Sequence, residues 1–259
     1  MKTVFQAFIV ECIKLRRTRV VWITMVLFVF MPLMLGLFSY IAGHPEMLGK
    51  SGLITLKAGM FGQNTWKGYM NILMQSGAGL GMAGTGFVAA YIFGREYSDR
   101  TFKDLLALPV ARASMVYGKF ILVILWSMIL LSILYTVGVL TAFLTGIQWD
   151  GTAFREITGR FYLQAVLTIL VTSPVAYIAC VGKGFYAPLG FCILTLILAN
   201  LVGTVGIGPY FPWAVPGLAG MNMKLQGMHV DTVGYLLLAL TAAAGFFLTV
   251  FHWVHADHH

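Results

Sequence analysis

Six stretches of apolar residues dominate the chain, and the charged residues gather between them. Each stretch approaches the roughly 20 residues that a helix needs to cross about 30 Å of hydrocarbon, and none contains Lys, Arg, Asp or Glu. Because a spanning segment must satisfy its own backbone hydrogen bonds in lipid, helices are expected. The pattern predicts an all-α integral membrane protein, a single membrane domain over residues 1–259 with six transmembrane helices at about residues 20–43, 72–93, 120–146, 161–181, 185–207 and 233–256.

The distribution of the basic residues predicts the topology. The net charge is +8, and eleven of the 17 Lys and Arg residues lie before the first span or in the second-to-third and fourth-to-fifth loops. The positive-inside bias therefore places these loops and both termini in the cytoplasm, as expected for a multi-pass protein of a bacterial plasma membrane. The same distribution favours topology over nucleic-acid binding. An odd number of cysteines, three, in reducing or apolar surroundings predicts no disulfide framework.

Residues 1–19 have the pattern of an interfacial helix. Apolar residues recur at helical spacing, and basic residues crowd the end at Lys14, Arg16, Arg17 and Arg19. We expect an amphipathic helix on the inner leaflet, where anionic headgroups attract each nearby basic side chain by about 1 kcal/mol. The alternative is an orientation signal without helical order.

The second apolar segment is rich in glycine. Gly77 and Gly81 form a G-x-x-x-G pair, which allows close approach of helix backbones in lipid, either within the subunit or across a dimer. The segment also contains G-x-G-x-x-G, but no strand precedes it and no βαβ unit surrounds it, so we expect no dinucleotide site. The run 43–51 ends in Gly-Lys-Ser without the spacing of a phosphate-binding loop.

Prolines mark two irregular places. Pro174 predicts a kink in the fourth span, and residues 182–184 then form a tight turn to the fifth. Residues 208–232 contain three prolines interleaved with aromatic and apolar residues. Short re-entrant or interfacial helices are expected there, with an ordinary outer loop as the alternative.

No constellation in the chain points to catalysis or to a metal. A hydrolase would need a nucleophile with a base, or metal ligands that face one another. His252 and His255 share a helix face, and His258 and His259 follow, but an interfacial helix end with a polar tail accounts for them; the last two also resemble the remnant of a tag. We expect no catalytic residue, no metal site and no cofactor in this chain.

Residues 94–119 carry eight charged positions among 26, between the second and third spans. Two opposite-charge pairs at (i, i+4), Glu96 with Arg100 and Asp99 with Lys103, favour a helix. Phe102, Leu105 and Leu106 form an apolar stripe, Pro109 ends it, and a second helical piece is predicted from about Ala113 into the third span. The residues alone leave open whether the stripe rests on lipid or on a protein partner.

This loop resembles that of type-2 ABC exporter permeases, most closely the bacitracin-export and antimicrobial-peptide-immunity group. The residues that carry the resemblance are Arg95-Glu96-Tyr97, Arg100-Thr101-Phe102-Lys103, Leu105-Leu106, Leu108-Pro109, Arg112 and Gly118-Lys119. The basic N-terminal segment with Glu11, the six spans and the proline-rich stretch before the last span agree with it, so the resemblance covers essentially the whole chain.

The resemblance implies that transport and ATP hydrolysis are carried out by separate chains. The loop would be a coupling helix that docks on a separate cytoplasmic ABC ATPase, which binds ATP and Mg²⁺. Two permeases, as a homodimer or a related heterodimer, would face each other in the bilayer and export an amphipathic substrate such as a peptide antibiotic. The residues that would transmit force are Glu96, Arg100, Thr101, Phe102, Leu105 and Pro109, with the two apolar side chains as buried anchors.

The sequence is also compatible with two other functions, an ion-coupled secondary carrier and a membrane scaffold or sensor. An ion-coupled secondary carrier usually buries carboxylates or uses broken helices, and the six spans contain no acid. A membrane scaffold or sensor would bind a cytoplasmic partner without transporting anything.

Overall fold

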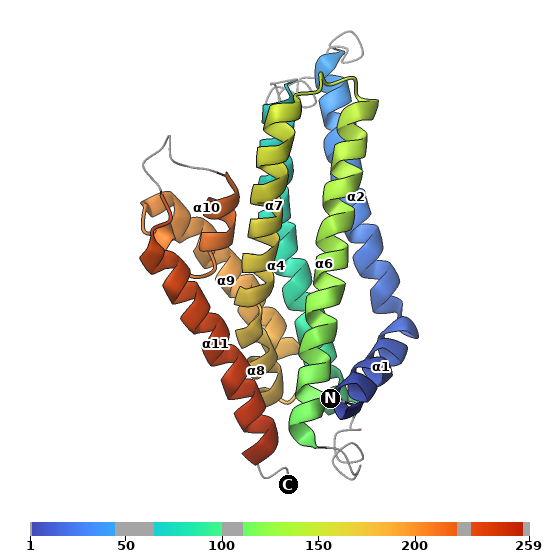
Figure 1. Ribbon diagram of the computed structural model, residues 1–259, viewed down its shortest axis with the longest axis vertical. Coiled ribbons are helices and arrows are strands. Elements are labelled where there is room, and N and C mark those ends of the chain that lie inside the picture. Colours follow the sequence, from blue (N-terminus) through green and yellow to red (C-terminus); the bar gives the residue numbers. More distant parts are fainter. Residues whose placement is uncertain (1, 45–64, 100–110, 222–228, 256–259) are drawn as a thin grey trace.

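The computed structural model describes residues 2–44, 65–99, 111–221 and 229–255, and all regular secondary structure within them is helical (Figure 1). Six helices are long and apolar enough to cross a membrane, counting α7 and α8 as one. The predicted fold class, all-α with six spans, is therefore confirmed. The elements are α1 (Lys2–Arg16), α2 (Arg19–Gly43), α4 (Trp66–Ser98), α6 (Arg112–Leu144), α7 (Gly151–Val171), α8 (Ser173–Val181), α9 (Tyr186–Val205), η2 (Gly208–Tyr210), α10 (Val215–Met221) and α11 (Thr232–His255).

Three helices extend beyond the apolar segments that predicted them. Helix α4 begins six residues before residue 72 and ends five residues after residue 93, α6 begins eight residues before residue 120, and α7 begins ten residues before residue 161. Hydropathy marks the part of a helix that faces hydrocarbon, whereas capping and polar residues decide where the helix ends. The Thr65 side chain accepts a hydrogen bond from the Gly68 amide at the start of α4. Asp150 accepts from the amides of Thr152 and Ala153 at the start of α7.

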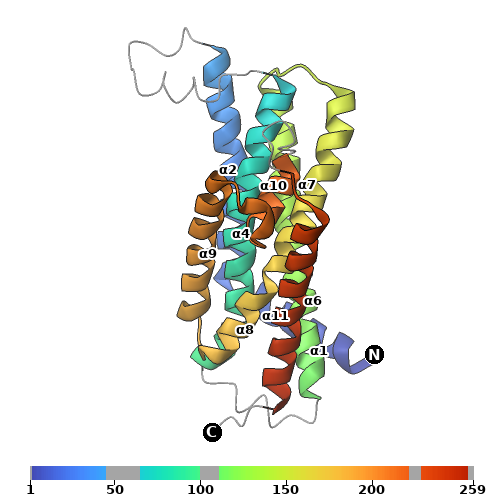
Figure 2. The same ribbon diagram turned by 90° about the vertical axis from the view of Figure 1, so that its left-hand side faces the viewer.

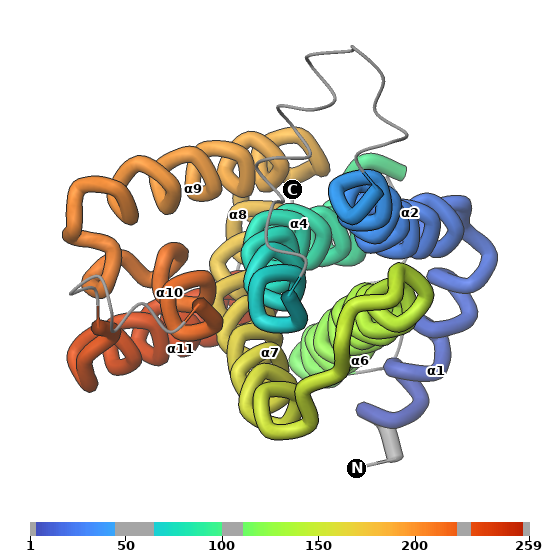
Figure 3. The backbone as a smooth tube through the Cα atoms, turned by 90° about the horizontal axis from the view of Figure 1, so that it is seen from above, coloured from blue at the N-terminus to red at the C-terminus, as the bar shows by residue number. Residues whose placement is uncertain are grey.

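Helix α4 is the centre of the bundle. In its spanning window 67% of residues are buried, against 17% in α9 at the periphery, and Figure 3 shows α4 surrounded by α2, α6, α7 and α9. A Cβ added to Gly77 would lie 3.1 Å from the Phe161 ring of α7, and one added to Gly81 would lie 3.0 Å from Leu131 of α6. These two glycines thus contact helices of the same chain.

The fourth span is broken where Pro174 predicted a kink. Helix α7 ends at Val171, Thr172 lies between the helices, and Pro174 stands in the first turn of α8. The turn from α8 to α9 covers residues 182–185, one residue more than predicted, and Lys183 adopts a φ of 44° within it. Gly94 of α4 lies against this turn, because a Cβ there would be 2.7 Å from the Gly184 carbonyl oxygen.

Short helices precede the last span, as expected. Helix α10 packs on α4 and α7 near the start of α11, part of the way along the bundle (Figure 2). Gly217 lies beside Ala78, and Gly220 lies against the side chain of Gln164, whose Nε2 donates to the Met74 carbonyl at 3.0 Å. One end of the bundle holds α1 and the last turn of α11 (Figure 1), and we call it the terminal end.

Candidate functional site

Four charged side chains meet inside the bundle at the terminal end. Glu11 and Lys14 come from α1, Glu96 from α4 and Lys119 from α6. Each lysine contacts both carboxylates: Lys14 Nζ lies 2.8 Å from Glu11 Oε1 and 3.0 Å from Glu96 Oε1, and Lys119 Nζ lies 3.3 Å from Glu11 Oε2 and 2.9 Å from Glu96 Oε1. These four residues form a closed ring of alternating charge, which we call the ion-pair cluster.

The ion-pair cluster is buried. Lys119 is 0% exposed, Glu96 4% and Glu11 8%, and only Lys14 reaches solvent or lipid headgroups with a third of its side chain. A lone charge in such surroundings would be costly, so the pairing of two cations with two anions is what makes the burial tolerable. Burial by itself would raise the pKa of Glu11, but the ammonium groups of Lys119 and Lys14 outweigh it, and the pKa lies below its ordinary value.

Lys119 has further partners that fix its position. Its ammonium donates to the Ile92 carbonyl of α4 at 3.1 Å. It also lies about 6 Å from the ring centres of Phe93 and Trp253, a geometry in which aromatic faces attract cations. The Trp253 indole of α11 in turn donates to Cys180 Sγ of α8 at 3.1 Å. The ion-pair cluster therefore ties α1, α4 and α6 together and rests on α8 and α11.

Small residues bring the backbones close enough for these contacts. A Cβ on Gly118 of α6 would lie 3.0 Å from the Phe8 amide nitrogen of α1, so the two helices touch directly beside Lys119. Glu11 and Leu15 of α1 face the bundle, whereas Phe5 is 63% exposed. Helix α1 thus packs one face on the protein and leaves an apolar face for lipid, in agreement with the predicted amphipathic helix.

The ion-pair cluster adjoins both ends of the segment 100–110, which lies outside the described residues. Helix α4 ends at Ser98, two residues after Glu96, and α6 begins at Arg112, seven residues before Lys119. Among the described residues, Glu96 Oε2 has no hydrogen-bond partner although it is buried. Less than two helical turns on either side separate Glu96 and Lys119 from the helix ends next to this segment.

The structure places the predicted coupling residues unevenly. Arg100, Thr101, Phe102, Leu105 and Pro109 lie outside the described residues, as do Lys103 and the predicted Asp99–Lys103 and Glu96–Arg100 pairs. Within the described residues, Asp99 accepts a hydrogen bond from Arg95 Nε at 3.1 Å. The second helical piece begins at Arg112, one residue before the predicted start.

Two predicted site residues belong to the ion-pair cluster. Glu96, predicted to transmit force from the loop, is buried there, because two lysines far away in the sequence neutralise it. Lys14, predicted at the membrane surface, contacts both carboxylates and keeps a third of its side chain exposed, whereas Arg16, Arg17 and Arg19 are exposed.

The sequence offered one sign of this cluster. Glu11 is the single acid among five basic residues in positions 1–19, and apolar residues flank it on both sides. A lone carboxylate on an apolar helix face indicates a buried basic partner. Lys119 gave no such sign, since it looked like the last basic residue before a span.

The histidines near the end of α11 make ordinary contacts. His252 packs edge-on against Tyr177, and His255 stacks on Phe251 in the preceding turn. Within the described ranges no three His, Cys, Asp or Glu side chains are grouped as metal ligands. His258 and His259 lie beyond residue 255 and outside the description.

Six helices among the described residues are long and apolar enough to span a membrane, which defines a multi-pass membrane protein. The family model described as ABC-2 family transporter protein matches residues 7–200. The chain belongs to this family and is a permease of an ABC transporter in the plasma membrane. It is similar to the "Bacitracin transport permease protein BCRB" of Bacillus licheniformis, with 22% identity over 177 residues that cover 67% of this chain and 84% of that protein. No solved structure matches the chain.

Proposed function

We propose that this permease couples ATP hydrolysis by a separate cytoplasmic ABC ATPase to the export, or removal from the membrane, of an amphipathic substrate. ATP and Mg²⁺ would bind to the ATPase, and a second permease, identical or related, would complete the pathway. The family supports the ATPase as partner. The single observation that carries the coupling is the ion-pair cluster, which joins three helix ends directly beside the segment 100–110.

The coupling would work through rigid attachment. A push on segment 100–110 acts on the end of α4 and the start of α6, and Lys119 and Lys14 hold α1 to both. Separating a buried ion pair leaves uncompensated charge in a low-dielectric interior, so the three helix ends resist moving apart. Because α4 is the central helix, its displacement would reach all the helices that pack on it.

The orientation and the substrate belong to the same proposal. The terminal end carries exposed basic residues such as Arg16, Arg17 and Arg112, which favours the cytoplasmic side for both termini. A peptide antibiotic is the favoured cargo, because the similar Bacillus protein is named for bacitracin transport.

Two sets of variants separate docking from coupling. In cells that produce the permease with its cognate ATPase, the double variant Phe102→Asp/Leu105→Asp should abolish co-purification of the ATPase. Lys119→Met should retain co-purification and lose resistance to the antibiotic. Glu156→Gln, which removes an exposed ion pair with Arg160 at the other end of the bundle, is the matched control and should behave as the wild type.

Each part can fail separately. Retained ATPase binding in the Phe102/Leu105 variant would remove these side chains as anchors. Full resistance with Lys119→Met would remove the ion-pair cluster from the coupling. Unchanged antibiotic sensitivity after deletion of the permease would rule out a peptide antibiotic as the cargo.

A further inference from the structure

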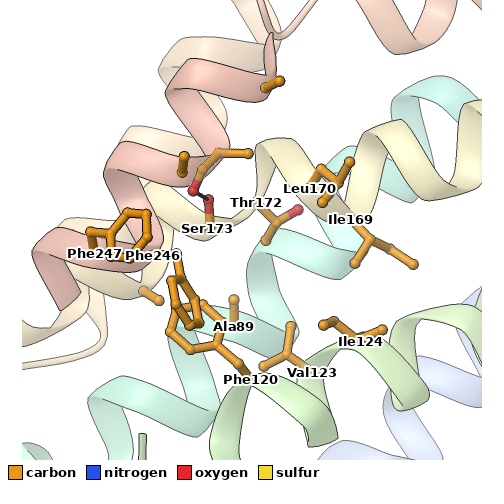
Figure 4. A pocket seen from close by; sticks show the side chains of 14 residues that line it. Ala89, Phe120, Val123, Ile124, Ile169, Leu170, Thr172, Ser173, Phe246 and Phe247 are labelled. Atoms are coloured by element: carbon orange, nitrogen blue, oxygen red, sulfur yellow. Dashed lines mark hydrogen bonds between the residues drawn. The ribbon is translucent and has the colours of Figure 1, made fainter. Parts of the chain in front are cut away.

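An apolar cavity of about 380 Å³ lies between α4, α6, α11 and the break between α7 and α8 (Figure 4). It occupies the half of the membrane-spanning region nearer the terminal end, since its wall on α6 begins at Phe120, next to Lys119. Its side chains are alanines, larger apolar residues and two hydroxyls: Ala89, Phe120, Val123, Ile124, Ile169, Leu170, Thr172, Ser173, Ala176, Ala239, Ala242, Ala243, Phe246 and Phe247.

The broken fourth span and the small residues of α11 create the cavity. Gly245 lies directly on the Ser173–Pro174 peptide, where a Cβ would be 2.5 Å from the Pro174 nitrogen. This close approach draws α11 toward α8. Three alanines of α11, Ala239, Ala242 and Ala243, then leave space between α11 and α6 that larger side chains would fill.

Both hydroxyls in the wall already donate hydrogen bonds to the backbone. Thr172 Oγ1 donates to the Thr168 carbonyl at 2.8 Å, and Ser173 Oγ donates to the Ala242 carbonyl at 2.7 Å. A bound water needs two to four polar partners, and cavities without them stay dry and take apolar molecules. The wall therefore favours hydrocarbon over water.

The cavity opens toward the lipid. Ile124, Leu170 and Phe247 line it and are 46%, 42% and 67% exposed on helices that span the membrane. A cavity of about 150 Å³ accommodates benzene. On that scale 380 Å³ holds on the order of 15 carbon atoms, which is the size of one acyl chain rather than two.

A cation stands at the terminal end of the same two helices. Arg112, at the start of α6, is exposed, and the one hydrogen bond that the described residues give it is a long one of 3.5 Å to the Val254 carbonyl of α11. Between Arg112 and the cavity, Tyr117 stacks on Phe246 at 5.9 Å and continues the apolar wall. Free guanidinium N–H groups suit a phosphate, which accepts two of them in parallel.

We propose that this cavity binds one acyl chain of an anionic phospholipid from the leaflet at the terminal end, with the lipid phosphate on Arg112. The bound chain fills the gap between α6 and α11 and so stabilises the position of α11 beside the ion-pair cluster. This site lies within one permease chain and needs neither the ATPase nor a second permease.

The test uses the full-length permease in nanodiscs with a phosphatidylglycerol that carries a photoactivatable group in its acyl chain. We expect cross-links at Ile124, Phe246 or Phe247. Ala243→Phe should fill the cavity and lower this labelling about tenfold. The matched control is Ala244→Phe, because Ala244 is the next residue of α11, is exposed and does not line the cavity; its labelling should equal that of the wild type.

A second readout addresses the headgroup and the risk of misfolding. Arg112→Gln should lower the preference for phosphatidylglycerol over phosphatidylcholine severalfold while labelling with either lipid persists. Ala239→Phe, at another exposed lining position, replaces Ala243→Phe if that variant does not purify as a folded protein. Equal labelling in the cavity-filling and control variants, or displacement of the lipid by added peptide antibiotic, would overturn the proposal.

Discussion

Replacing Lys119 by methionine removes the most buried charge of the ion-pair cluster and leaves an unbranched side chain only one heavy atom shorter. In the wild type its ammonium contacts two carboxylates at 2.9 and 3.3 Å and one carbonyl at 3.1 Å. Removing one partner from a buried ion pair costs about 3–5 kcal/mol. Because Lys14 still contacts both carboxylates, we expect the lower end of this range, about 3 kcal/mol.

This loss is measurable as a thermal shift of the purified permease in one detergent at one pH. At roughly 2–4 °C per kcal/mol for a chain of this size, Lys119→Met should lower Tm by about 6–12 °C. Glu156→Gln, which breaks an exposed pair with Arg160, should shift Tm by less than about 2 °C.

A double variant tests whether the effect comes from charge pairing. Glu96→Gln with Lys119→Met leaves one cation and one anion, so its destabilisation should fall short of the sum of the single variants by about 1–3 kcal/mol. A Tm shift for Lys119→Met as small as that of Glu156→Gln, or strict additivity in the double variant, would refute the buried ion-pair cluster.

Two further predictions concern α1. The pKa of Glu11 is lowered in the folded protein, so the stabilisation that its charge provides is complete above the ordinary pKa of 4.5 and is lost as the pH falls through the lower folded pKa. In a titration of Tm against pH in the acid range, Glu11→Gln should remove the part of the slope that Glu11 causes. An unchanged slope would contradict the pairing of Glu11 with the two lysines. Gly118→Leu should push α1 away from α6, since a Cβ at Gly118 would already lie 3.0 Å from the Phe8 amide nitrogen. Maleimide labelling of the half-buried Cys12 should then rise severalfold. Gly190→Leu, with open space at its Cβ, is the control, and equal labelling in both variants would argue against the contact between α1 and α6.

Much of the fold could be predicted from local pattern. Runs of apolar residues indicated the six spans, Pro174 indicated the break in the fourth, and the prolines of 208–232 indicated short helices. Each of these sequence features determines the backbone structure within a few residues of its own position. The ends of α4 and the start of α7 were missed for the converse reason, because hydropathy follows the hydrocarbon layer and these helices continue beyond it.

The ion-pair cluster depends on contacts that local pattern does not encode. Lys14 and Glu96 are 82 positions apart, and their pairing follows from how α1 packs on α6 at Gly118. Glu96 also had a plausible local partner in Arg100, which made a surface role attractive. Burial decides between these roles, and burial is a property of the packed bundle.

The central claim is that the ion-pair cluster makes the terminal ends of α1 and α6 move together while the ATPase works. Spin labels can be placed at Ile13 of α1 and Ile121 of α6, which are both exposed. Pulsed electron–electron double resonance on the complex with its ATPase then measures the distance between the two helices. The distance distribution should be the same in the nucleotide-free and ATP-trapped complexes, and it should shift or broaden between them when Lys119→Met is introduced. A distance that changes between the two states in the complex with Lys119 intact would contradict the account.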